Sequence, residues 1–175
     1  MNTYDPEKHD RKAMRLKGFK YSWAGSYFVT ICSHNRKCIF GSVVNEKMYL
    51  NEIGQILHEE WLALPDRYPY IDLDTFQVMP NHMHGIVNIY DKPVKANHPD
   101  AGDPPSSLDS MMGAYKSIVF NKTLKIYKKK NQWLDKLWQE RFRDRIIRNS
   151  REYRNIAHYI FNNPPNWRKD KLYVE

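Results

Sequence analysis

The chain has 175 residues, of which 41% are hydrophobic and 14% aromatic, and its 28 Lys and Arg residues outnumber its 20 Asp and Glu residues. This length suits one domain with one well-buried core, and the hydrophobic content excludes a disordered chain. No apolar run is long enough for a transmembrane helix, and the polar N-terminus lacks the apolar segment of a secretory signal. Two cysteines cannot build a disulfide framework. We therefore expect a soluble, cytoplasmic protein.

The excess positive charge is concentrated in one stretch. Residues 116–154 hold 13 basic and four acidic side chains, whereas the rest of the chain is close to neutral. Such clustering is typical of polyanion-binding proteins, because Lys and Arg release counterions from phosphates. The alternative is a solvated helix face, and the charge alone supports the two interpretations equally. A second basic group, in residues 8–20, belongs to a polar N-terminal arm that would either order on DNA or stay disordered.

The first half of the chain predicts strands around one helix. Asn45 and Glu46 are expected to turn a hairpin, and Pro80-Asn81 separates two strands that are antiparallel if this break is tight. Asn51 can cap a helix with one apolar face, which Pro65 should end. The strands are expected at residues 26–33, 38–44, 47–50, 71–79 and 82–90.

The second half predicts two helices and one ambiguous segment. Residues 91–105 are rich in proline and aspartate and predict a surface loop. Ser106 with Asp109 resembles a capping box that begins an amphipathic helix, which runs to about Lys129. Residues 138–147 could be a further strand, and a last helix from Asn149 or Ser150 ends at Pro164-Pro165. This element order predicts an α+β sandwich with an antiparallel sheet.

The sharpest local motif is Pro80-Asn81-His82-Met83-His84. Residues i and i+2 of a strand point to the same face, so His82 and His84 would present two imidazoles side by side. Paired imidazoles can bind a divalent metal, although a third ligand must come from elsewhere. The alternative is two surface histidines on an edge strand.

A second candidate pair is Tyr159 with Asn163, four residues apart near the end of the last helix. Such residues lie one turn apart on one face. A tyrosine hydroxyl can act as a nucleophile if a nearby cation compensates for its high pKa, and an amide oxygen suits magnesium or manganese. A core aromatic residue and a helix stop are the alternatives. The sequence contains no P-loop, dinucleotide-binding or nucleophile-elbow motif.

Four blocks in order resemble the REP-associated tyrosine transposases, which are relatives of the one-tyrosine HUH transposases of small insertion sequences. They read RLKGFKYSWAGSYFVTICSHNRKCIFG, FQVMPNHMHGIV, LWQERFRDRIIRN and YRNIAHYIFNNPPNW, and they span about residues 15–167. The third block departs from the family pattern, because Arg141–Arg145 stands where many relatives carry an aromatic pair followed by an acidic residue and histidine.

The resemblance implies a ferredoxin-like α+β fold and a role for each candidate residue. His82 and His84 match the metal-binding HUH pair, Asn163 matches the polar residue that completes the metal site, and Tyr159 matches the nucleophile. The implied reaction cleaves single-stranded DNA through a 5′-phosphotyrosine with Mg²⁺ or Mn²⁺, and the free 3′-hydroxyl can later reverse the step. Because the phosphotyrosine keeps the bond energy, strand transfer would need no ATP.

The implied substrate is single-stranded DNA with a short hairpin, such as a repeated extragenic palindrome. The implied location is therefore the nucleoid. Homodimer and monomer both occur among relatives. We divide the chain into a basic arm (1–20), one transposase-like domain (21–168) and a tail (169–175). Phosphate contacts are expected from seven basic residues, namely Lys116, Lys122, Lys125, Arg141, Arg143, Arg145 and Arg148.

Two other functions stay open at this stage. The chain could be a domesticated, catalytically inactive module that binds hairpin DNA or RNA. A rolling-circle replication initiator also uses the HUH motif, but the short chain without a helicase segment disfavours it.

Overall fold

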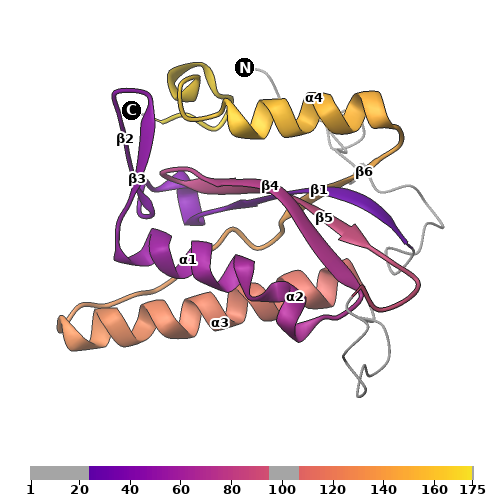
Figure 1. Ribbon diagram of the computed structural model, residues 1–175. Coiled ribbons are helices and arrows are strands. Elements are labelled where there is room, and N and C mark those ends of the chain that lie inside the picture. Colours follow the sequence, from indigo (N-terminus) through magenta and orange to yellow (C-terminus); the bar gives the residue numbers. More distant parts are fainter. Residues whose placement is uncertain (1–23, 95–106, 175) are drawn as a thin grey trace, which may run out of the picture.

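The computed structural model describes residues 24–94 and 107–174. The expected N-terminal arm, most of the expected loop at 91–105 and Ser106 lie outside these ranges. Within them, one four-stranded sheet holds helices on both of its faces (Figure 1).

The sheet has the order β4-β5-β1-β6, and all three pairings are antiparallel. This confirms the predicted α+β class, and the chain order β-α-β-β-α-β of its main elements is that of a ferredoxin-like fold. The ambiguous segment 138–147 contributes the edge strand β6. The bounds are Gly25–Cys32 for β1, Ile71–Val78 for β4, His82–Ile89 for β5 and Arg143–Ile147 for β6.

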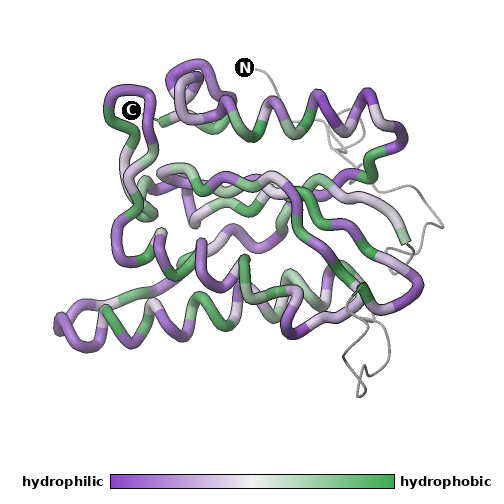
Figure 2. Tube along the Cα trace, viewed as in Figure 1, coloured by the Kyte–Doolittle hydropathy of each residue, from purple (hydrophilic) through white to green (hydrophobic). Residues whose placement is uncertain are grey.

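The helices form one layer on each side of the sheet. Figure 1 shows α1 and α3 on one side and α4 on the other, and Figure 2 shows the apolar side of α4 turned toward the sheet. A short 3₁₀ segment follows β1 and another follows α4. The helical bounds are Glu52–Leu62 for α1, Leu64–Arg67 for α2, Leu108–Lys129 for α3, Ser150–Phe161 for α4, His34–Arg36 for η1 and Trp167–Lys169 for η2.

Side-chain caps begin the three long helices. The Asn51 side chain accepts hydrogen bonds from the backbone N–H groups of Ile53 and Gly54, as predicted, and Asn149, one of the two residues expected at the start of the last helix, accepts from the Glu152 N–H. Ser107, not Ser106, caps α3. The expectation for Pro65 was wrong: α1 ends at Leu62, and Pro65 lies in the first turn of α2, where a missing N–H is tolerated.

The predicted hairpin is confirmed as a two-stranded sheet of β2 (Gly41–Val44) and β3 (Lys47–Leu50). Asn45 and Glu46 both have positive φ angles, 48° and 64°. A two-residue turn with this geometry matches the twist of the flanking strands.

Strand β5 is buried on both faces, so it divides the core in two. On the face toward α1 and α3, Met83 and Val87 pack in one cluster with Trp61 and Tyr115. On the face toward α4, Ile86 packs in a smaller cluster with Ile147, Ile156 and Ile160. The histidines of the motif lie on this second face, because they alternate with Met83 along the strand.

Candidate metal and nucleophile site

His82 and His84 lie side by side on the central strand β5, with ring centroids 4.5 Å apart. Their exposed fractions are 0% and 3%. The alternative of two surface histidines on an edge strand is therefore wrong. Trp167 packs against the His82 ring at 5.9 Å between centroids, and Phe28 packs against His84 at 5.2 Å.

The buried Asn81 side chain orients the His82 ring. Its amide nitrogen donates to the backbone carbonyls of Arg36 and Leu172, at 3.1 and 2.8 Å. The Asn81 Oδ1 atom must then accept, and it lies 2.8 Å from His82 Nδ1. The proton of a neutral His82 ring is thereby held on Nδ1, which leaves the lone pair on Nε2. This buried Nε2 atom has no hydrogen-bond partner among the described residues.

The His84 ring is held between a hydroxyl on each side. Its Nδ1 atom lies 2.8 Å from Thr30 Oγ1, and its Nε2 atom lies 3.2 Å from the hydroxyl of Tyr159. Thr30 is the cross-strand neighbour of His84 on β1. The strand register therefore supplies the second partner that a metal-binding imidazole needs.

Both imidazoles are neutral at physiological pH. Burial lowers the pKa of His82 to about 4, although the Asp170 carboxylate opposes this shift. Burial and the neighbouring His82 lower the pKa of His84 to about 3. A neutral imidazole is the form that binds a metal.

Tyr159 lies on α4 in the same chain as the histidine pair and is 44% exposed. Its hydroxyl donates to Asp170 Oδ2 at 3.0 Å or to His84 at 3.2 Å. Partial burial, together with the Asp170 carboxylate, raises the pKa of Tyr159. The side chain is thus open to a ligand on one side and faces polar groups on the other, which excludes the alternative of a core aromatic residue.

Asn163 lies just beyond α4, because the helix ends at Phe161. Its amide nitrogen donates to Asp170 Oδ2 at 2.5 Å. Its Oδ1 atom is buried and has no hydrogen-bond partner among the described residues. Asn163 is therefore brought to the histidines by the turn that follows the helix, not by the helix itself.

Asp170 is the member of this cluster that the sequence did not reveal, since we placed it in the C-terminal tail. Its Oδ1 atom accepts from the Leu172 N–H at 2.6 Å. Burial raises the pKa of Asp170, but hydrogen bonds from the Leu172 N–H and the Asn163 amide outweigh that effect and hold it below its usual value. Asp170 is thus an anion in a half-buried position.

The donor atoms at this place fit a divalent cation. One ligand atom from each of His82, His84 and Asp170 lies within 4.8 Å of the others. The unpartnered Nε2 of His82 and Oδ1 of Asn163 both carry lone pairs that a cation would satisfy. Two imidazoles with carboxylate and amide oxygens suit manganese well and magnesium less well.

Three of the seven basic residues expected to contact DNA have partners within the chain. Lys116 donates to the backbone carbonyls of Gln139 and Glu140, Lys122 pairs with the buried Glu60, and Arg145 pairs with Glu152. The other four are exposed and form no ion pair with a described residue: Lys125, Arg141, Arg143 and Arg148. Arg143 is the cross-strand neighbour of Thr30, so it lies on the same sheet face as His84.

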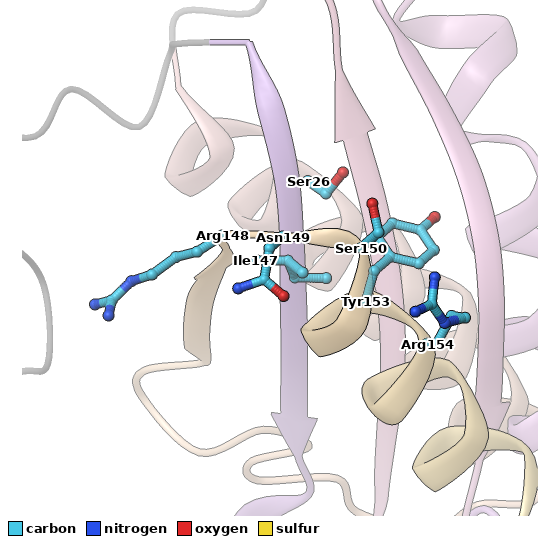
Figure 3. Close-up of a pocket in the computed structure, with 7 residues that line it drawn as sticks. All are labelled: Ser26, Ile147, Arg148, Asn149, Ser150, Tyr153 and Arg154. Carbon is cyan, nitrogen blue, oxygen red and sulfur yellow. The ribbon is translucent and has the colours of Figure 1, made fainter.

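Two cavities flank α4. One, of about 260 Å³, borders Tyr159, Asn163 and Asp170 near the end of the helix. The other, of about 450 Å³, lies at the beginning of the helix (Figure 3). In Figure 3, Arg148 extends away from Tyr153 and Arg154, so the lining basic groups do not converge on one point.

Across the described residues, no helix is both long and apolar enough to cross a membrane.

No family model matches the chain. It is 32% identical to an uncharacterized protein of Haemophilus influenzae over 98% of each chain. Among solved structures, it is similar to a REP-associated tyrosine transposase bound to a REP hairpin, with a TM-score of 0.58 and 22% identity over 86% of this chain and 73% of the other. The fold implied by the sequence resemblance is thereby confirmed.

Proposed function

The chain belongs to one family with the Haemophilus influenzae protein and has the fold of a REP-associated tyrosine transposase, and from this premise we propose a function. It is a metal-dependent, transposase-like endonuclease and strand transferase that acts on single-stranded DNA through a 5′-phosphotyrosine. The observation that supports this proposal most is the Tyr159 hydroxyl, 3.2 Å from His84 in a cluster of buried metal-type ligands.

In the proposed reaction, the Tyr159 oxygen attacks a backbone phosphorus in line. A bond forms between this oxygen and phosphorus, and the bond to the 3′-oxygen of the preceding nucleotide breaks. The Tyr159 proton passes to Asp170, which already accepts its hydrogen bond, and the departing 3′-oxygen takes a proton from water. The products are a 5′-phosphotyrosine and a free 3′-hydroxyl.

We propose that His82, His84 and Asp170 hold the cation, with the Asn163 amide oxygen completing the set. When bound, the cation would polarise the phosphate and offset its charge. Asn81 and Thr30 keep the two imidazoles oriented for this role. Manganese should support cleavage at least as well as magnesium, because two of the ligands are imidazoles.

The proposed substrate is single-stranded DNA that carries a hairpin, and the structural neighbour bound to a REP hairpin supports this choice. Arg143 lies on the face of the sheet that carries the histidines, and we propose that it contacts a phosphate near the cleaved bond. With chromosomal DNA as substrate, the protein would act at the nucleoid in the cytoplasm. One chain contributes both Tyr159 and the histidine pair, so we propose that a monomer is sufficient.

The test is adduct formation by Tyr159→Phe. The protein is incubated with Mn²⁺ and single-stranded hairpins from the DNA beside its own gene, and denaturation-resistant protein–DNA adducts are counted. Tyr159→Phe should form none while hairpin binding survives. Tyr153→Phe is the matched control, because Tyr153 lies on the same helix but its hydroxyl contacts Asp74 and Asn88 instead. Equal adduct yields from Tyr159→Phe and wild type would rule out this nucleophile.

A non-catalytic hairpin-binding module is the second candidate, and the raised pKa of Tyr159 favours it. A protonated phenol is a poor nucleophile unless a cation lowers its pKa. Tight hairpin binding by the wild-type protein, without any adduct in Mn²⁺ or Mg²⁺, would select the module over the enzyme.

A further inference from the structure

We propose that Trp133, just beyond the end of α3, stacks on an unpaired base in the loop of the hairpin DNA, with Lys128, Lys129 and Lys136 binding the neighbouring phosphates. The inference rests on the proposed function, because it takes hairpin DNA as the ligand. It adds a second DNA contact on the helix layer opposite the candidate metal and nucleophile site. This contact supplies affinity for the hairpin and takes no part in cleavage.

Trp133 is 87% exposed, the largest exposed fraction among the large hydrophobic side chains of the described residues. The chain around it is not exposed in the same way, because Leu134 and Leu137 are buried at 9% and 1%. Single exposed apolar side chains are common on protein surfaces, but a covered tryptophan ring buries roughly 150–250 Å². A ligand that covers this indole therefore gains more than it would at any smaller apolar side chain.

A well-defined turn presents the ring. At the end of α3 the Gln132 N–H donates to the Tyr127 carbonyl at 2.8 Å, and the Asn131 N–H donates to the Lys128 carbonyl at 3.1 Å. Asn131 has a left-handed backbone with a φ angle of 51°. These two bonds form the Schellman motif, which satisfies the last carbonyls of a helix. The backbone before Trp133 is thus fixed and the next residue is buried, so little backbone ordering remains to oppose binding.

The charge around the ring selects the kind of partner. Residues 128–136 hold four lysines and one acidic residue. Of these lysines, only Lys130 forms an ion pair with a described residue, at 2.9 Å from Glu52. The other three are exposed, namely Lys128, Lys129 and Lys136. Cations beside an exposed aromatic ring fit the phosphates and bases of unpaired nucleic acid, whereas an apolar protein surface would desolvate them without a partner.

The position of the ring points to the loop of the hairpin. Helices α3 and α4 lie on opposite sides of the sheet, and both end toward the same side of the molecule, on the left in Figure 1. Trp133 follows α3 and Tyr159 lies near the end of α4, so DNA that is cleaved at Tyr159 meets Trp133 with a part remote from the cleaved bond. Stem bases are paired and stacked on one another, and the loop supplies bases with a free face.

The test is a binding cycle with the full-length protein and a chelator, so that cleavage does not enter the measurement. Two hairpins share one stem and one backbone, but in the second the loop nucleotides are abasic. Trp133→Ala should weaken binding of the normal hairpin about tenfold in fluorescence anisotropy, as expected for the loss of one stacked base. Wild type should lose the same factor on the abasic hairpin, and Trp133→Ala should lose nothing further there.

Three more variants separate the ring from the charge. Trp133→Phe keeps an aromatic ring and should keep most of the affinity. Lys129→Met should weaken binding of both hairpins alike, because both contain the phosphates. Tyr90→Ala is the matched control: Tyr90 is another exposed aromatic residue, at 43%, but it follows β5 at the end opposite His82, and its removal should leave binding unchanged.

The outcomes separate this inference from the function on which it rests. Equal affinity of Trp133→Ala and wild type for the normal hairpin would overturn the contact, and so would an undiminished effect of Trp133→Ala on the abasic hairpin. If the first result came with a loss of self-association in sedimentation, the indole would belong to a contact between copies. Hairpin binding that depends on Trp133, in a protein that forms no adduct, would support the inference and overturn the proposed cleavage. Absence of hairpin binding by wild type would overturn the inference whatever the adduct test shows.

Discussion

The two faces of strand β5 differ in what covers them, although both are buried. Toward α1 and α3, Met83 and Val87 meet Trp61 and Tyr115, and the Tyr115 hydroxyl donates to the Leu57 carbonyl at 2.9 Å. Toward α4, the residues that alternate with them include both histidines of the candidate site. A single strand thus divides a core that stabilises the fold from a layer that can perform chemistry.

This difference explains how the fold tolerates the burial of His82, His84 and Asn163, whose desolvation costs free energy. The face toward α1 and α3 holds the larger apolar cluster, whereas the cluster on the face toward α4 has four buried apolar residues in the part of the chain that the structure describes. Because apolar burial supplies most of the folding free energy, the α4 face can carry desolvated imidazoles and two acceptors that have no partner in the described part of the chain. Substitutions on the first face should change stability, and those on the second should change metal binding and reactivity.

The largest effect is expected at Trp61, on the stabilising face. Trp61→Ala should lower the free energy of unfolding by about 3–5 kcal/mol, because the ring is fully buried and would leave a cavity. A Cβ atom at Gly85 would lie 2.4 Å from Trp61 Cζ2, so Gly85→Ala alone should cost about 1–3 kcal/mol. The two costs should not add, because removing the ring also removes the clash. Urea denaturation of both single variants and the double variant measures this, and additive costs would contradict the packing described.

The second effect is a loss of stability in acid that arises on the α4 face. The unfolded chain binds a proton at His82 near pH 6.5, whereas the folded chain binds it only near pH 4. Between these values protons favour the unfolded state, so the free energy of unfolding should fall as the pH drops from about 6.5 to about 4. The loss should be on the order of 3 kcal/mol for His82 alone.

Urea denaturation of chelator-treated protein across this pH range would check the acid effect. His82→Asn, which has no group that titrates there, should reduce the slope to about half, because His84, with a folded-state pKa of about 3, still contributes over this range. An equally steep fall in that variant would assign the effect to other groups.

The third effect is a loss of metal affinity on substitution of Asp170, the residue of the C-terminal tail that lies in the candidate site. Asp170→Asn keeps a side chain that can accept from the Leu172 N–H, but it removes the anionic ligand. Mn²⁺ affinity, measured by calorimetry, should fall at least about tenfold. The pKa of Tyr159 should also fall, because the Asp170 carboxylate helps to raise it, and ultraviolet titration would detect this. Asp135→Asn, at an exposed residue, is the control, and wild-type Mn²⁺ affinity in Asp170→Asn would remove Asp170 from the ligand set.

The sequence could predict the parts of this molecule that depend on local patterns. Alternation placed both histidines on one strand face, and the cap at Asn51 followed from short-range hydrogen bonding. The position of Asp170 depends instead on the turn after Asn163, which folds the chain back on itself and has no periodic signal. Contacts between residues far apart in the sequence could not be predicted either: Asn81 donates to the Leu172 carbonyl, and Lys122 forms an ion pair with Glu60.

The smallest effect compares two lysines of α3, Lys122 and Lys125, which the sequence treated alike. The Glu60 side chain is only 4% exposed, and hydrogen bonds from Lys122 and Arg67 hold its pKa below the usual value despite burial. Lys122→Met should therefore cost about 1 kcal/mol of unfolding free energy and leave hairpin binding unchanged. Lys125→Met should leave stability unchanged and weaken hairpin binding a few-fold, with the salt dependence of binding reduced by about 0.7 for one lost phosphate contact. Binding titrations at several salt concentrations, with urea denaturation of the same variants, would measure both. Equal weakening of binding by the two variants would mean that Lys122 leaves Glu60 when DNA binds, and the ion pair would then be a competitor of DNA, not a fixed part of the fold.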